Sequence, residues 1–84
     1  MDTERLKGKN ILITGAAQGM GATNAEHFAA QGANVCLGDV NEAGVAEVAE
    51  RINAAGNGRA IAVKLDVTSR EDNAAAVKAL VDEF

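Results

Sequence analysis

The chain has 84 residues, a net charge of −4, one His, one Cys and no Tyr or Trp. This length allows a single domain, and one His with one Cys cannot form a zinc site or an internal disulfide, so we expect no metal. The acidic balance argues against a nucleic-acid partner. Because no apolar run is long enough for a membrane span or a signal peptide, we expect no membrane contact and a cytoplasmic location.

The first half of the chain reads as a strand, a helix and a second strand. The β-branched run at 10–14 predicts a strand that is buried on both faces. A glycine-rich stretch at 15–21 leads into a predicted helix over 22–31, which Gly32 closes. The residues at 34–39 predict the second strand.

The second half repeats the same alternation. Asn41 can cap a helix whose apolar positions fall on one face, and the segment 54–58 ends it. A third strand is predicted at 60–65. Ser69, with an acidic residue three positions later, resembles a capping box before a third helix. The apolar residues expected on these two helices are Val45, Val48, Ala49, Ile52, Val77, Leu80, Val81 and Phe84.

The resulting order, β-α-β-α-β-α, indicates the α/β class. Such alternation implies parallel strands joined by right-handed crossovers. We therefore predict a Rossmann-type, three-layer α/β/α arrangement, the N-terminal half of a doubly wound parallel sheet. Residues 1–84 would form one dinucleotide-binding half-domain.

The glycine-rich stretch carries the strongest functional signal. Thr14 to Gly21 reads TGAAQGMG between a predicted strand and a predicted helix. Glycines at Gly15, Gly19 and Gly21 allow a sharp turn and a close approach to a ligand. The free N–H groups of the first helical turn can then bind a pyrophosphate without a lysine, which fits the lack of basic residues between Lys9 and Arg51.

Asp39 supplies a second signal, because it ends the second predicted strand 18 residues after Gly21. An acidic residue at about this separation can accept both adenosine ribose hydroxyls and would repel a 2′-phosphate. NADP would need a nearby cation, yet Gln18, Val40 and Asn41 occupy the natural places. We interpret the site as selective for NAD, with NADP as the alternative.

These motifs make the chain resemble the N-terminal part of a short-chain dehydrogenase/reductase. TGAAQGMG is similar to that family's cofactor motif, LKGKNILITG to its lead-in, and Leu65-Asp66-Val67-Thr68 to the turn after its third strand. The resemblance implies that Gly15, Gln18, Gly19, Met20 and Gly21 surround the pyrophosphate and riboses. It also implies Asp39 on the ribose, Val40 beside the adenine, Asp66 on the adenine amino group and Val67 in the adenine pocket. From its position alone, Asp66 could equally cap the third helix.

The same resemblance implies a hydride-transferring oxidoreductase that acts on a small-molecule alcohol or carbonyl compound. In that family a Ser, a Tyr and a Lys of a YxxxK motif carry the reaction, and this sequence contains no Tyr. We therefore name no catalytic residue and expect the chain alone to be inactive. The alternative is a non-catalytic dinucleotide-binding module that a partner completes. In the family strand order, 3-2-1-4-5-6, the first strand of this chain would be an open edge, so we expect a homo-oligomer or aggregation.

Overall fold

The computed structural model describes residues 7–56 and 58–84. It contains three strands and three helices in the predicted alternation: β1 (Asn10–Thr14), α1 (Gly19–Ala30), β2 (Asn34–Asp39), α2 (Glu42–Ala55), β3 (Arg59–Lys64) and α3 (Arg70–Glu83). The start of the lead-in segment, at residue 6, and residue 57 of the expected turn at 54–58 lie outside the described residues. Among the helices described, none is long and apolar enough to cross a membrane.

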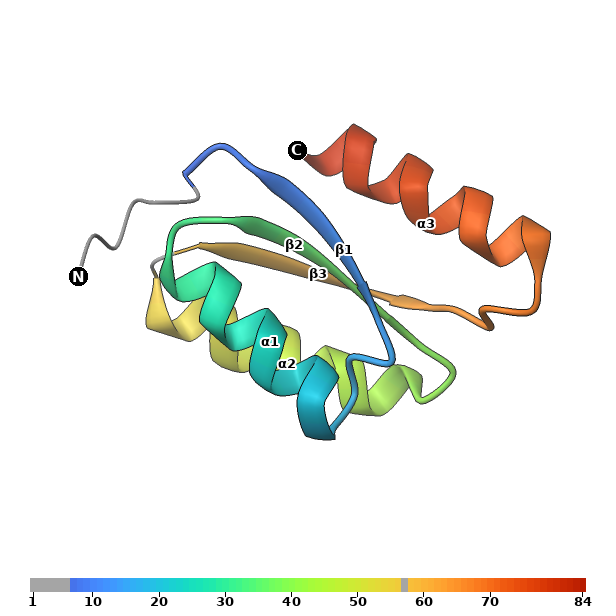
Figure 1. The fold of residues 1–84 in the computed structure, drawn as a ribbon, viewed down its shortest axis with the longest axis horizontal. Helices are drawn as coiled ribbons and strands as arrows, with labels where there is room; N and C mark the ends of the chain where they lie inside the picture. The colour runs from blue at the N-terminus through green and yellow to red at the C-terminus, as the bar shows by residue number, and fades with distance from the viewer. Residues whose placement is uncertain (1–6, 57) are drawn as a thin grey trace.

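The strands form one parallel sheet in the order β1-β2-β3. Helices α1 and α2 cover one face of this sheet and α3 covers the other (Figure 1). This confirms the predicted three-layer arrangement. Within the described chain β1 pairs only with β2, so its other edge makes no hydrogen bonds within the sheet.

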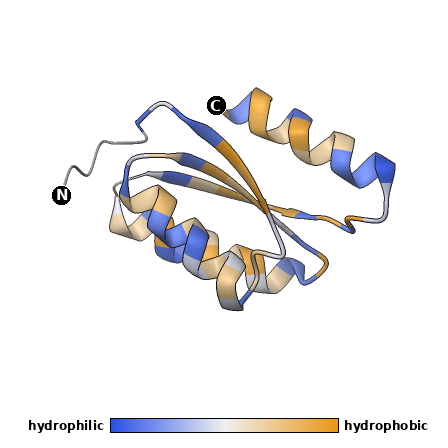
Figure 2. Cartoon of the chain, viewed as in Figure 1, coloured by the Kyte–Doolittle hydropathy of each residue, from blue (hydrophilic) through white to orange (hydrophobic). Residues whose placement is uncertain are grey.

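The main core lies between the sheet and the α1–α2 layer. The apolar positions predicted for α2 are buried, and α1 contributes three alanines, so the helices approach the sheet closely. The buried residues of these two helices are Ala22, Ala25, Ala29, Val45, Val48, Ala49 and Ile52. Figure 2 shows the hydrophobic stretches that run along the strands beneath these helices.

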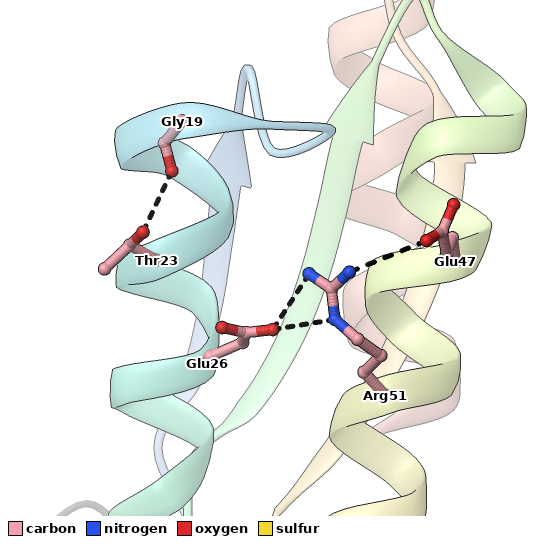
Figure 3. Close-up of polar contacts among 5 residues, drawn as sticks. All are labelled: Gly19, Thr23, Glu26, Glu47 and Arg51. Carbon is pink, nitrogen blue, oxygen red and sulfur yellow. Dashed lines mark hydrogen bonds and ion pairs between the residues drawn. The ribbon is translucent and has the colours of Figure 1, made fainter.

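Polar side chains also join the two helices of this layer (Figure 3). The guanidinium of Arg51 lies 2.9 Å from Oε1 of Glu26 on α1 and 3.7 Å from Oε1 of Glu47 on its own helix. On α1, the hydroxyl of Thr23 donates to the carbonyl oxygen of Gly19 at 3.1 Å. Because the side chains of the Arg51 network are about half exposed or more, we expect it to orient α1 against α2 and to add little stability.

Four details differ from the sequence-based expectation. Strand β1 is not buried on both faces, since its central residues are only partly buried and its two end residues are exposed. Helix α1 begins at Gly19 instead of position 22, because the glycine-rich stretch itself forms the first turn after an extended Gln18 (φ −161°). Strand β3 begins and ends one residue earlier than expected, because its Arg59 pairs with Asn34 of β2. On α3 the buried residue is Ala76, whereas Val77 and Val81 are 50% and 67% exposed, because α3 lies alone on its face of the sheet.

Candidate functional site

A pocket of about 200 Å³ opens at the carboxyl ends of the strands, where the predicted cofactor residues meet. Its lining comes from the end of β2 and from the loops that follow all three strands, and consists of Gly15, Asp39, Val40, Leu65, Asp66 and Val67. Five of these six residues were predicted from the sequence. Leu65 was not, although its place at the end of an apolar strand run is the signal that could have indicated it.

Backbone hydrogen bonds fix the three loops relative to one another. The N–H of Ala16 donates to the carbonyl oxygen of Gly38 at 3.2 Å, and the N–H of Leu65 donates to that of Asp39 at 2.9 Å. Parallel strands place their carboxyl ends at one edge of the sheet, where α/β proteins bind ligands. The pocket is therefore built where backbone hydrogen bonds join the ends of the three strands.

The glycine-rich turn packs α1 against the end of β1 at a distance that excludes a side chain. A Cβ atom on Gly21 would overlap the carbonyl oxygen of Gly15 and lie 2.8 Å from its carbonyl carbon. Gly15 and Gly19 both have positive φ, 64° and 62°, which glycine adopts without strain. Backbone packing at Gly21 and the positive φ of Gly15 and Gly19 thus favour glycine at these positions whether or not a ligand binds.

The N-terminus of α1 is open to an anion. Gln18 is the N-cap, its side chain makes no capping hydrogen bond, and the first turn contains no acidic residue. The N–H groups at this end have no acceptor within the helix, and the helix dipole adds positive potential. Gln18, Gly19 and Met20 are exposed there, Met20 to 80%. These predicted residues adjoin Gly15 along the motif but do not line the strand-end pocket itself.

Asp39 joins the pocket to the glycine-rich turn. Its Oδ2 accepts a hydrogen bond from the N–H of Ala17 at 3.2 Å, and its Oδ1 accepts one from the N–H of Asn41 at 2.9 Å. Each carboxylate oxygen can accept a further hydrogen bond. The nearest cation by strand register is Lys64, the partner of Asp39 on β3, a neighbour that spacing along the chain does not reveal.

Asp66 lies in a tight turn between β3 and α3. Its Oδ1 accepts from the N–H of Thr68 at 2.9 Å and from the Thr68 hydroxyl at 2.6 Å. These hydrogen bonds lower the pKa of Asp66, so the carboxylate stays ionised to a lower pH than an ordinary aspartate. The N-cap of α3 is Ser69, whose side chain accepts from the N–H of Asp72. The carboxylate of Asp66 is thus held by Thr68 and is not the helix cap.

Two apolar side chains flank the same pocket. Val40 is 62% exposed and Val67 is 59% exposed. The buried side chain of Leu65, which is 1% exposed, also lines the pocket. An exposed apolar pair beside fixed acceptors can hold a flat, partly apolar ligand that carries hydrogen-bond donors.

Comparison with known proteins shows the family of this chain. The family model described as short chain dehydrogenase matches residues 9–84. This chain belongs to that family. It is 46% identical over 80 residues to the 2,5-dichloro-2,5-cyclohexadiene-1,4-diol dehydrogenase LinX of Sphingobium indicum, an alignment that covers 95% of this chain and 32% of the relative.

Two further proteins show the same relationship. The trans-4-hydroxycyclohexanecarboxylate dehydrogenase of Sinomonas cyclohexanicum is 47% identical over 87 residues, with 98% of this chain and 34% of the relative covered. A solved short chain dehydrogenase/reductase from Burkholderia phymatum in complex with NAD superimposes with a TM-score of 0.87 at 33% identity, covering 93% of this chain and 27% of that one. The chain thus spans about a third of the length of these curated relatives.

Proposed function

We propose that residues 1–84 form the NAD-binding half-domain of an oxidoreductase that transfers hydride between NAD(H) and an alcohol or carbonyl substrate. The observation that carries this proposal is the single pocket in which Gly15, Asp39 and Asp66 meet beside the open N-terminus of α1. The solved relative in complex with NAD supports the choice of ligand.

Each part of the site would hold one part of the dinucleotide. The first turn of α1, with Gly15, Gln18, Gly19, Met20 and Gly21, would bind the pyrophosphate through backbone N–H groups. Asp39 would accept the adenosine ribose hydroxyls. Asp66 would accept from the adenine amino group between Val40 and Val67. The bound nicotinamide ring would supply the hydride chemistry, and the residues described here would hold the other end of the cofactor.

NAD is proposed over NADP because the carboxylate of Asp39 occupies the end of β2. Its two hydrogen bonds to backbone N–H groups fix it in place, and a fixed negative charge repels a 2′-phosphate. Lys64 is the cation that could oppose this preference. Calorimetric titration of the purified protein with NAD and with NADP tests the proposal, and equal affinities for the two would refute the NAD assignment.

The substrate proposed is a hydroxylated small molecule or the matching carbonyl compound. The two curated relatives are named as dehydrogenases of a cyclic diol and of a hydroxycyclohexanecarboxylate, which supports this class. Because this sequence contains no Tyr, we propose that these residues bind cofactor without turnover. Substrate-dependent NADH formation by the 84-residue chain would refute that. The alternative remains a non-catalytic module that a partner completes, and the one-sided pairing of β1 favours such a partner.

We also propose a homo-oligomer in the cytoplasm. The open side of β1 offers backbone groups to a second copy. Cys36 is a buried, unpaired thiol, of the kind that a reducing compartment preserves. Light scattering and cell fractionation test these two points.

A further inference from the structure

We propose that Asp72 and Asn73, in the first turn of α3, are positioning residues that hold Asp66 and Val67 in place to read the adenine amino group. The inference rests on the proposed binding of NAD and extends it to residues that do not line the pocket. Both side chains are half-buried, and both reach back from the helix to the turn after β3.

Asp72 holds the backbone of Asp66. Its Oδ2 accepts from the N–H of Asp66 at 3.0 Å, while its own N–H donates to Oγ of Ser69 at 3.1 Å. In a capping box the acidic side chain returns to the N–H of the cap residue. Here it reaches three residues further back, so the first turn of the helix fixes the residue that faces the ligand.

Asn73 holds the next residue of the turn. Its Nδ2 donates to the carbonyl oxygen of Val67 at 3.0 Å and to that of Ser69 at 2.8 Å. Together, Asp72 and Asn73 fix one backbone group on each of Asp66 and Val67. An exposed turn that is held in this way loses less conformational freedom when a ligand binds.

The orientation of the Asp66 side chain completes the arrangement. Both hydrogen bonds from Thr68 go to Oδ1, which leaves Oδ2 to accept from a donor on the ligand. With the backbone fixed by Asp72 and the carboxylate by Thr68, this oxygen has a defined position at the pocket. The amino group of adenine is a donor that such an acceptor can bind.

The affinities for two related ligands distinguish a positioning role of Asp72 from a general structural role. Nicotinamide hypoxanthine dinucleotide has a carbonyl oxygen where NAD has the adenine amino group, so it has no donor for Asp66 at that position. We expect the parent protein to prefer NAD over this analogue. Asp72→Ala should weaken NAD binding by roughly threefold to tenfold, the effect of one net hydrogen bond. The same variant should change the affinity for the hypoxanthine analogue by less than about twofold, because that ligand does not use the contact.

Two further variants act as controls. Asp72→Asn keeps a side-chain oxygen that can accept from the N–H of Asp66, and should restore the preference for NAD. Glu71→Ala removes the same charge from the same helical turn, but Glu71 is exposed, so this variant should bind both ligands like the parent. If Asp72→Ala does not fold, as judged by circular dichroism, Asn73→Ala tests the same inference through the carbonyl group of Val67.

The outcomes distinguish this inference from the proposed function. If Asp72→Ala weakens both ligands equally, the residue has only a structural role and the inference is wrong, while NAD binding stands. If the parent binds NAD and the analogue equally, Asp66 does not read the amino group and the inference also fails. If the parent binds neither dinucleotide, the proposed function itself is wrong.

Discussion

The N–H of Ala17 donates a 3.2 Å hydrogen bond to Oδ2 of Asp39, across 22 positions of sequence. The residue proposed to bind the adenosine ribose therefore also holds the glycine-rich turn proposed to bind the pyrophosphate. The two parts of the site are connected through one carboxylate, so changes at Asp39 will affect both.

The first prediction concerns this double role. Asp39→Ala should weaken NAD binding by about tenfold or more, because it removes a charged acceptor for ligand hydroxyls and the acceptor for Ala17. It should also raise the affinity for NADP relative to NAD, because the charge that repels the 2′-phosphate is gone. Calorimetric titration with both dinucleotides measures this.

Two variants sharpen that measurement. Asp39→Asn keeps an oxygen for the N–H of Ala17 and removes the charge, so it should shift the NADP preference with a smaller loss of NAD affinity. Glu42→Ala, an exposed acidic residue in the first turn of α2, should change neither. A parent-like preference for NAD in both Asp39 variants would contradict the assigned role.

The second prediction concerns the packing of the glycine-rich turn. Gly21→Ala places a methyl group against the carbonyl group of Gly15 and should lower the free energy of unfolding by about 1–3 kcal/mol. It should also reduce NAD affinity, because α1 must move away from the end of β1. Urea unfolding and dinucleotide titration measure the two effects.

A second glycine provides the control for Gly21. Gly56 ends α2 with a φ of 81°, and a Cβ atom there would meet nothing within 4 Å. Gly56→Ala should therefore cost stability, about 1 kcal/mol, through backbone strain alone. If it weakened NAD binding as strongly as Gly21→Ala at matched stability, close packing at Gly21 would not be the cause.

The third prediction concerns the ionisation of Asp66. Thr68→Val removes the hydroxyl donor and keeps the N–H donor, so the pKa of Asp66 should rise toward its ordinary value of 3.8. Because the folded pKa is the lower one, the stabilisation by this pair is present above pH 3.8 and is lost as the pH falls through the folded pKa.

Carbon-detected NMR titration of the Asp66 carboxyl group measures that shift directly. Thr23→Val is the matched control, because the hydroxyl of Thr23 donates to Gly19 on α1 and lies outside the turn. An unchanged pKa of Asp66 in Thr68→Val would show that the hydroxyl does not stabilise the carboxylate.

The fourth prediction concerns the open side of β1. Asn10–Thr14 pairs only with β2 in the described chain, and Ile11 and Ile13 are partly buried against the core. A strand with free backbone groups and apolar side chains recruits other chains, so the protein should form dimers or larger species. Light scattering that shows a stable monomer at tens of micromolar would reject this expectation.

The sequence was sufficient for the order of the elements because each carries its own local signal. Alternation of β-branched runs with helical periodicity indicated the six elements, and Asn41 caps α2 as expected, accepting from the N–H of Gly44 at 3.0 Å. The start of α1 was predicted at position 22 because glycine has a low helix propensity, yet the helix includes Gly19 and Gly21. Packing against Gly15 and the extended Gln18 decide it instead.

In the candidate site, too, local patterns could be predicted and contacts between distant parts of the chain could not. Glycine spacing and a strand-end acid are local patterns, so Gly15 and Asp39 could be named in advance, whereas Asp66 was named because its turn resembles one of the family. Contacts made in space were missed. The hydrogen bond from Ala17 to Asp39 and the place of Lys64 beside Asp39 depend on strand register, and no spacing along a single chain reveals register.

The exposure of Val40 and Val67 has a thermodynamic consequence. Without a ligand, both side chains keep much of their apolar surface in water, 62% and 59% exposed. A base that enters between them would remove that surface, so binding should have a negative heat-capacity change. The melting temperature should then rise with dinucleotide concentration. The amount of cofactor in the cell would thereby help to determine how much of this chain is folded.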